Sequence, residues 1–279
     1  MSSGANAVSV DNKTTIRRFT VPDFRARKRR EPIVMLTAYT ARMAELLDAH
    51  CDALLVGDSL AQAIYGLPST VPVTLDMMIA HGQAVVRGSK KTMVIIDMPF
   101  GSYEASQEQA FFSASRVLKE TGADAVKLEG GVAMAPTVAF LTSRGIPVMG
   151  HIGLTPQAVN VLGGYSARGK DDAERARIMT DAKAIDQAGA FSIVIEGVVE
   201  SLAIDITQKI NCPTIGIGGS NQCDGQVLVV DDMLGMFERT AKFVRKFDQL
   251  SARIDSAVSS YAAAVRSREF PGAENTYRT

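Results

Sequence analysis

From residue 32 onward, short apolar runs alternate with longer amphipathic stretches. The runs are continuous and often β-branched, which is typical of parallel strands buried on both faces. They lie at residues 33–38, 53–56, 93–96, 125–128, 147–150, 191–195, 214–217 and 227–230. Helical patterns lie between most of them, at 40–50, 74–88, 106–121, 134–144 and 171–188, and two more follow at 233–250 and 254–266. The alternation predicts strand–helix units repeated around one core.

About eight such units in a chain of 279 residues fit a (β/α)8 TIM barrel better than an open doubly wound sheet. No Gly-x-Gly-x-x-Gly motif follows the first predicted strand, so a dinucleotide-binding fold loses its main support. Ahead of the barrel, Thr20 suits an N-cap and Pro22 a first helical turn, predicting a short basic helix through Arg25–Arg30. We expect one barrel domain over 15–279 with a C-terminal helical extension, and a disordered lead over 1–14.

The composition narrows the class of partner. The chain has 30 Lys and Arg against 30 Asp and Glu, and this balance argues against nucleic acid or an anionic membrane. No apolar run approaches the roughly 18 residues that a membrane helix needs, and the N-terminus lacks the apolar core of a signal peptide. The cysteines Cys51, Cys212 and Cys223 form no C-x-x-C pair, which favours a reducing compartment. We therefore expect a cytoplasmic protein that acts on small molecules.

Acidic residues follow several of the buried strands, where the active site of such a barrel lies. Asp58, Asp97 and Glu129 come at the ends of the second, third and fourth strands. A helix N-cap would explain Asp58, but no helical pattern follows Asp97 until about Ser106. Three carboxylates this close repel one another unless a cation or protons intervene, and hard oxygen ligands favour Mg²⁺. We predict a metal site, with caps and salt bridges as the alternative.

Three further side chains at this mouth carry candidate chemistry. Lys127 faces the same interior as Glu129. Its candidate roles are to neutralise a substrate carboxylate or enolate, to pair with a barrel acid or, less favoured, to form a Schiff base. Glu196 has apolar neighbours that would raise its pKa and suit a general base, unless a nearby Lys or Arg pairs with it. His151 orients a substrate oxygen, shuttles a proton or is a satisfied core histidine. The glycine-rich turn Gly216–Ser220 resembles a phosphate-binding loop or leaves room for a flat ligand.

Five motifs in order and at compatible spacing resemble the ketopantoate hydroxymethyltransferase family. They are LVGDS at 55–59, IDMPF at 96–100, VKLEGG at 126–131, GHIGLTPQ at 150–157 and the turn at 213–219. The resemblance runs from about residue 15 to the Phe-Pro-Gly tail at 270–272. It implies a (β/α)8 barrel of the phosphoenolpyruvate/pyruvate type that assembles as a homo-oligomer, usually a decamer.

The resemblance also implies a reaction, in which a one-carbon unit passes from 5,10-methylenetetrahydrofolate to 3-methyl-2-oxobutanoate through a Mg²⁺-stabilised enolate. The product is 2-dehydropantoate, on the way to pantothenate. By motif position, the implied Mg²⁺ site is Asp58, Asp97 and Glu129, and the implied proton acceptor is Glu196. The expected 2-oxo acid site is Asp58, Ser59, Asp97 and Lys127, with His151 beside it. We expect the uncharged pterin to lie over the glycine-rich turn, where no side chain blocks it.

The chain departs from the family pattern at the rim of the predicted site. The departures are Thr40, Leu67, Pro68, Ala80, Ser220 and Asp231. None removes a metal ligand or the base, so they bear on folate affinity, loop closure and turnover more than on reaction type. Two other functions compete. One is a related Mg²⁺-dependent lyase acting beside an oxo acid, although no cysteine motif follows the fourth strand. The other is a barrel of reduced activity that serves as a binding or assembly subunit.

Overall fold

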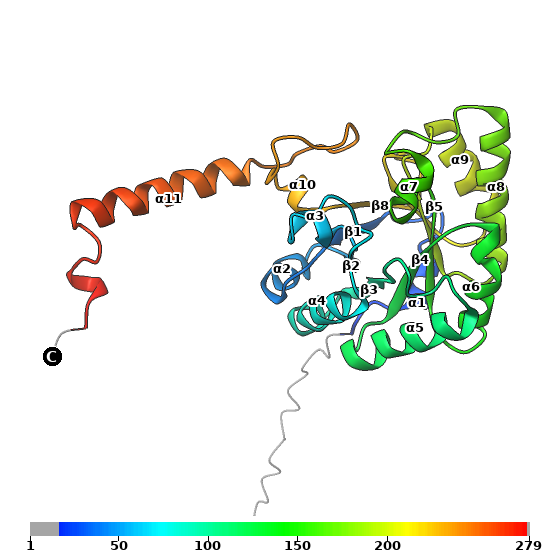
Figure 1. Ribbon diagram of the computed structural model, residues 1–279, viewed down its shortest axis with the longest axis horizontal. Helices are drawn as coiled ribbons and strands as arrows, with labels where there is room; N and C mark the ends of the chain where they lie inside the picture. The colour runs from blue at the N-terminus through cyan, green and yellow to red at the C-terminus, as the bar shows by residue number, and fades with distance from the viewer. Residues whose placement is uncertain (1–16, 278–279) are drawn as a thin grey trace, which may run out of the picture.

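A computed structural model describes residues 17–277 and shows a closed barrel of eight parallel strands (Figure 1). Each strand pairs with the next along the chain, and β8 pairs with β1. The strands are β1 Ile33–Thr37, β2 Ala53–Val56, β3 Met93–Asp97, β4 Ala125–Glu129, β5 Val148–Gly153, β6 Ser192–Glu196, β7 Thr214–Ile217 and β8 Gly225–Leu228. The predicted TIM barrel is confirmed, whereas the expected disordered lead at 1–14 lies outside the described residues.

Helices follow the strands and cover the outside of the barrel (Figure 1). The longer ones are α2 Ala41–Leu47, α4 Leu75–Gly88, α5 Gln107–Thr121, α6 Ala135–Thr142, α8 Asp172–Gln187 and α9 Glu200–Lys209. The shorter ones are α1 Val21–Ala26, α3 Leu60–Ala63, α7 Val159–Leu162 and α10 Val230–Met233. Several of these helices begin at a residue whose side chain caps the first turn. The Ser106 hydroxyl, for example, accepts the backbone N–H of Gln109 at the start of α5.

The strands are buried on both faces, which explains why their apolar runs are continuous. One set of residues packs under the helices, and the other fills the barrel interior. Phe24 of α1 closes the amino-terminal end of the barrel. Its ring is fully buried and meets Phe191 edge to face, with the ring centroids 5.3 Å apart. The interior is therefore sealed at one end, so that a ligand enters only from the carboxyl ends of the strands.

Of two predicted helices, one is shorter than expected and the other does not form. The basic helix ends at Ala26, because Arg29 takes a left-handed conformation (φ 56°) that lets its N–H donate to Asp224. The helix predicted over 233–250 is absent; only α10 forms, and the chain then runs irregularly to residue 249. Gly235 stops the helix with φ 75°, and a Cβ there would lie 2.3 Å from the carbonyl oxygen of Asp248. The last helix starts at Leu250 instead.

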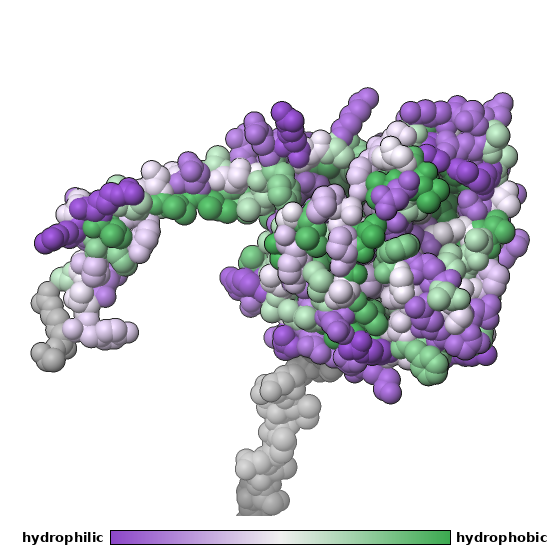
Figure 2. Space-filling view, viewed as in Figure 1, coloured by the Kyte–Doolittle hydropathy of each residue, from purple (hydrophilic) through white to green (hydrophobic). Residues whose placement is uncertain are grey.

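That last helix, α11 (Leu250–Ser267), projects away from the barrel as an arm (Figure 1). None of its residues is buried. One face carries an apolar stripe, visible in green along the arm in Figure 2. The stripe consists of Ile254, Val258, Tyr261 and Val265, which are 43–59% exposed. Within residues 17–277, no helix has the length and hydropathy required to cross a membrane.

Candidate active site

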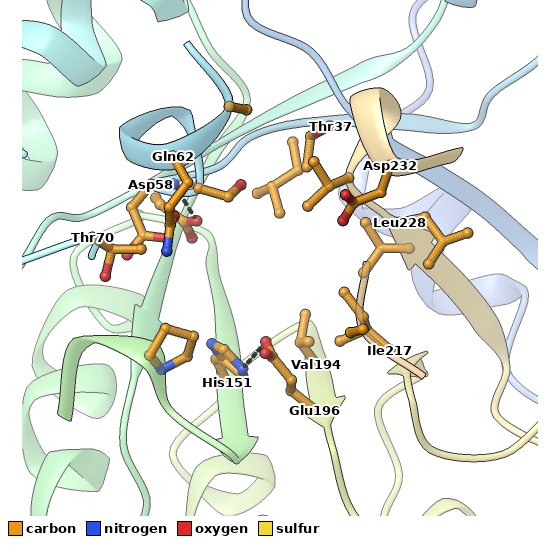
Figure 3. A pocket seen from close by; sticks show the side chains of 18 of the residues that line it. Thr37, Asp58, Gln62, Thr70, His151, Val194, Glu196, Ile217, Leu228 and Asp232 are labelled. Carbon is orange, nitrogen blue, oxygen red and sulfur yellow. Dashed lines mark hydrogen bonds and ion pairs between the residues drawn. The ribbon is translucent and has the colours of Figure 1, made fainter. Parts of the chain in front are cut away.

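A cavity of about 430 Å³ opens at the carboxyl ends of the strands. All the predicted site residues line it: Asp58, Ser59, Asp97, Lys127, Glu129, His151 and Glu196. Figure 3 shows Asp58 on one side, with His151 and Glu196 facing the same space from β5 and β6. Register explains the convergence, because Asp97 is paired with Lys127 and Glu129 with His151 across neighbouring strands. Residues at the same level of adjacent strands point to the same side.

Lys127 and Asp97 form a buried ion pair, with side chains 5% and 3% exposed. Burial raises the pKa of Asp97 to about 6, although Lys127 opposes the shift. Burial alone would lower the pKa of Lys127, but the carboxylates of Asp97, Asp58 and Glu129 outweigh it and raise that pKa. A lysine held in its charged form suits charge neutralisation and opposes Schiff-base chemistry, which needs a neutral amine.

His151 joins the metal-side carboxylates to Glu196. Its Nδ1 lies 3.3 Å from Oε1 of Glu129, and its Nε2 lies 3.1 Å from Oε2 of Glu196. Burial and Lys127 lower the pKa of His151, but the two glutamates outweigh them and raise it to about 9. The alternative expectation that a Lys or Arg pairs with Glu196 is therefore wrong. Its partner is a histidine on the neighbouring strand, because β5 and β6 pair at this level.

The helix-cap interpretation of Asp58 fails, because α3 begins only after Ser59. The backbone N–H of Asp58 donates to Oδ2 of Asp97 at 3.0 Å, so these two residues are joined directly. Its side chain accepts a hydrogen bond from Gln157 instead of capping a helix. The Ser59 hydroxyl lies 2.8 Å from the Tyr39 hydroxyl. Burial raises the pKa of Asp58, and Glu129 adds to that shift by repulsion.

Two buried residues outside the predicted site, Gln157 and Tyr103, brace these carboxylates. Gln157 Nε2 donates to Oδ2 of Asp58 at 2.9 Å, and its backbone N–H donates to Oε2 of Glu129 at 3.1 Å. The Tyr103 hydroxyl donates to Oε1 of Gln157 at 2.7 Å and accepts the N–H of Glu129 at 3.2 Å. Gln157 is the last residue of the GHIGLTPQ motif, and this position could have identified it as a site residue. No local sequence pattern identifies Tyr103.

The glycine-rich turn is not open as expected. The ring of Phe243, from the irregular segment after α10, packs on Gly218, where a Cβ would lie 2.6 Å from the ring. The expectation that no side chain covers this turn is therefore wrong. Sequence could not show the contact, because the 233–250 stretch was predicted as a helix instead of a segment that folds back over the barrel mouth.

The rim departures have local explanations at two positions. Thr40 stands where the family pattern has an acid, and its hydroxyl accepts the N–H of Met43 as the N-cap of α2. Threonine and aspartate both serve in that position, so the departure preserves the cap. Ser220 accepts the N–H of Gln222 and stabilises the turn after β7. Nothing in the structure explains the remaining departures.

The donor set suits a hard cation, but not one enclosed by three carboxylates. Among residues 17–277, no three His, Cys, Asp or Glu side chains are arranged to hold a metal ion by themselves. Both oxygens of Asp97 have partners, Lys127 and the N–H of Asp58. Both oxygens of Glu129 lie against Gln157 and His151. Mg²⁺ keeps several waters and needs only one or two carboxylates, so these residues fit Mg²⁺ with waters completing its shell.

Comparison with known proteins gives one family. The family model described as ketopantoate hydroxymethyltransferase matches residues 18–273. A protein from Novosphingobium aromaticivorans named 3-methyl-2-oxobutanoate hydroxymethyltransferase is 68% identical over 267 residues, covering 94% of this chain and 92% of that protein. One of the same name from Sphingopyxis alaskensis is 62% identical over 285 residues, covering 99% of each.

Solved structures extend the likeness at the level of fold. Phosphonopyruvate hydrolase in complex with oxalate and Mg²⁺ superposes with a TM-score of 0.59 at 11% identity, covering 92% of this chain and 93% of that one. A 2,3-dimethylmalate lyase gives a TM-score of 0.56 at 15% identity, covering 92% and 91%. At these identities the likeness shows the barrel architecture alone.

Proposed function

Because the chain belongs to the ketopantoate hydroxymethyltransferase family, we propose that it transfers a one-carbon unit from 5,10-methylenetetrahydrofolate to C3 of 3-methyl-2-oxobutanoate. The prediction that it is a transferase enzyme is confirmed by the family match and the curated relatives. In the proposed reaction a C–C bond forms between C3 and the donor's methylene carbon, and both C–N bonds that hold this carbon to the folate break. The two folate nitrogens take up the C3 proton and one proton from water. Water supplies the hydroxyl oxygen, and 2-dehydropantoate and tetrahydrofolate are released.

The observation that supports this proposal is the arrangement of charged side chains in the cavity, with a carboxylate cluster and a lysine on one side and a separate glutamate on another. The carboxylates Asp58, Asp97 and Glu129 lie with Lys127 at the ends of β2–β4. Glu196, at the end of β6, lies across the cavity from Asp58. We assign Asp58, Asp97 and Glu129 to the Mg²⁺ site, with water between the ion and those carboxylate oxygens of Asp97 and Glu129 that already face protein partners. Bound there, Mg²⁺ would supply positive charge to the developing enolate oxygen.

The remaining residues divide the work of binding and proton transfer. The Lys127 ammonium neutralises the substrate carboxylate, and the Ser59 hydroxyl donates to a substrate oxygen. Glu196 accepts the C3 proton, which leaves the electron pair at C3 for attack on the donor carbon. His151 bridges Glu129 and Glu196, so it holds the base toward the substrate. In this proposal, Mg²⁺ binding and proton abstraction belong to different walls of the cavity.

We also propose that the enzyme forms the homo-oligomer that the family resemblance implies, a decamer. The support is the unpaired arm, since the stripe of α11 would be left in water in an isolated chain. The barrel also exposes apolar side chains, since Val34 of β1 and Leu46 of α2 are 48% and 52% exposed. A second copy that lays its α11 there would bury both surfaces. Val258→Asp should yield smaller species by light scattering, and Ser256→Asp on the opposite face should not.

The reaction is tested with purified protein, 3-methyl-2-oxobutanoate, 5,10-methylenetetrahydrofolate and Mg²⁺, with 2-dehydropantoate measured by mass spectrometry. We expect product only when all three components are present, and a chelator should abolish it. Folded protein that yields no product with any divalent ion would refute the proposal and favour the barrel of reduced activity. Cleavage of the oxo acid instead of its extension would favour the lyase.

A further inference from the structure

The β7–β8 side of the cavity differs from the side that carries the charge cluster. Its lining is mostly apolar, from Ile217, Val227, Leu228, Val229, Phe237 and Phe243. Asp232 of α10 is the one carboxylate on this wall among the described residues, and Arg239 is the one guanidinium. Figure 3 shows Asp232 across the cavity from Asp58 and Gln62, with its carboxylate turned toward the open space. None of the residues assigned to the proposed reaction lies on this wall.

The reacting carbon must lie next to this wall. The substrate's charged oxygens belong with the cluster on β2–β4, and its C3 must reach Glu196 on β6. Glu196 is paired in register with Ile217 of β7, so the side of C3 that faces away from the cluster meets β7 and β8. The donor's methylene carbon has to approach C3 within a near-attack distance, and β7–β8 is the side that remains open to it.

We propose that the β7–β8 wall binds the pterin end of the one-carbon donor, with Asp232 accepting hydrogen bonds from its amino-pyrimidinone edge. That edge presents two adjacent N–H donors, which match the two oxygens of one carboxylate. Asp232 is available for this role, because its carboxylate has no hydrogen bond or ion pair within residues 17–277. The Lys246 ammonium nearby donates instead to the carbonyl oxygens of Phe237 and Glu238, at 2.6 and 2.9 Å. The inference rests on the proposed function.

Phe243 supplies the flat surface that such a ligand needs. Its ring rests on Gly218, which has φ 66° and leaves no room for a side chain beneath the ring. The ring therefore lies between the glycine turn and the cavity, where it lines the wall. A reduced pterin bears a flat pyrimidinone ring that stacks favourably on an aromatic face. The glycine turn thus acts indirectly, by seating the aromatic ring that contacts the donor.

The test separates donor binding from proton abstraction. Exchange of the C3 hydrogen of 3-methyl-2-oxobutanoate with D2O requires Mg²⁺, Glu196 and the oxo acid, but no donor. Asp232→Asn should therefore exchange at the wild-type rate within about twofold, while its KM for 5,10-methylenetetrahydrofolate rises about ten- to a hundred-fold, the loss expected for a charge-assisted hydrogen bond. Glu238→Gln, an exposed acid of the same segment that does not line the cavity, is the matched control.

Each outcome bears on one claim. Wild-type protein that neither exchanges the C3 hydrogen nor forms product refutes the proposed function. Wild-type protein that does both, with a donor KM unchanged in Asp232→Asn, refutes the donor wall alone. Loss of exchange in Asp232→Asn also refutes it, because the residue would then serve the oxo acid. If Asp232→Asn does not fold, Asp232→Glu and calorimetry with tetrahydrofolate give the same decision, with weaker binding expected and unchanged binding contradicting the inference.

Discussion

Both ends of the barrel carry rings of acidic residues, but their partners differ. At the amino-terminal end, the acids accept backbone N–H groups at the strand starts. Asp52 accepts from Val34 at 2.9 Å, Asp124 from Val94 at 2.8 Å, and Asp224 from Thr214 at 2.8 Å. At the carboxyl end, the acids are crowded together in one cavity and face mainly side chains. The same residue type is used to close the barrel at one end and to hold charge at the other.

The partners of an acid distinguish a structural role from a functional one. An acid bonded to backbone amides satisfies groups that would otherwise be costly to bury, so it contributes to folding. A neighbouring acid raises the pKa of a buried carboxyl, as Glu129 does for Asp58, so such a set adds little stability. Such an arrangement persists where a ligand or ion uses it. Substitutions of acids at the carboxyl end should therefore lower activity, and substitutions of acids at the amino-terminal end should lower stability.

The largest effect is expected at the carboxyl end. Glu196→Gln keeps the shape of the side chain but removes the proton acceptor, so kcat for transfer should fall by about 10²- to 10⁴-fold. The melting temperature should change little, because the Glu196 side chain is 17% exposed and has one histidine as its partner. A Glu196→Gln variant whose kcat stays within threefold of the wild-type value would refute the assignment of Glu196 as the proton acceptor.

At the amino end, Asp224→Ala should destabilise the fold by about 3–5 kcal/mol. The Asp224 side chain is 2% exposed, and it pairs with Lys28 at 2.9 Å while accepting the N–H groups of Arg29 and Thr214. Its loss would leave a poorly exposed ammonium and two amides without a partner. Urea unfolding measures the change, and a loss below 1 kcal/mol would contradict the division between the two ends. Activity at low temperature should survive.

Gln157→Ala tests whether the brace serves the metal site. We expect Mg²⁺ or Mn²⁺ binding, measured by calorimetry without substrate, to weaken about 10- to 100-fold, because a residue orienting the ligands is lost. Gln83→Ala is the matched control, since that side chain donates only to the Glu120 carbonyl oxygen on the barrel exterior. Equal metal affinity in both variants would reduce Gln157 to a packing role.

The smallest effect is a pH-dependent one at Asp48. Burial would raise the pKa of Asp48, but hydrogen bonds from the backbone N–H groups of Thr92, Lys91 and Lys90 outweigh it and lower the pKa below 3.8. The charged form therefore stabilises the fold fully above the unfolded pKa of about 3.9, and this is lost as pH falls through the lower native value. Asp48→Asn should cost about 1 kcal/mol at pH 7 and less below pH 4. A cost that stays constant down to pH 2.5 would contradict this.

Sequence predicted the features that depend on local periodicity. β2 and β7 have the predicted bounds, and the strand-end acids converge, because burial on both faces produces continuous apolar runs that end at the mouth. Features that depend on distant contacts were missed. Gln157 binds Asp58 and Tyr103, 99 and 54 residues away, and nothing near it in the chain encodes that pairing. The 233–250 stretch has helical spacing, but Gly235 and the fold-back to Asp248 override it.

We propose that Glu196 takes the C3 proton while the carboxylate cluster holds the oxo acid. The most direct test is proton NMR of 3-methyl-2-oxobutanoate in D2O with Mg²⁺ and no folate, comparing wild-type protein, Glu196→Gln and Asp224→Ala at a temperature where all are folded. We predict exchange at C3 with the wild type and Asp224→Ala, and its loss with Glu196→Gln. Exchange at the full wild-type rate in Glu196→Gln would contradict the account.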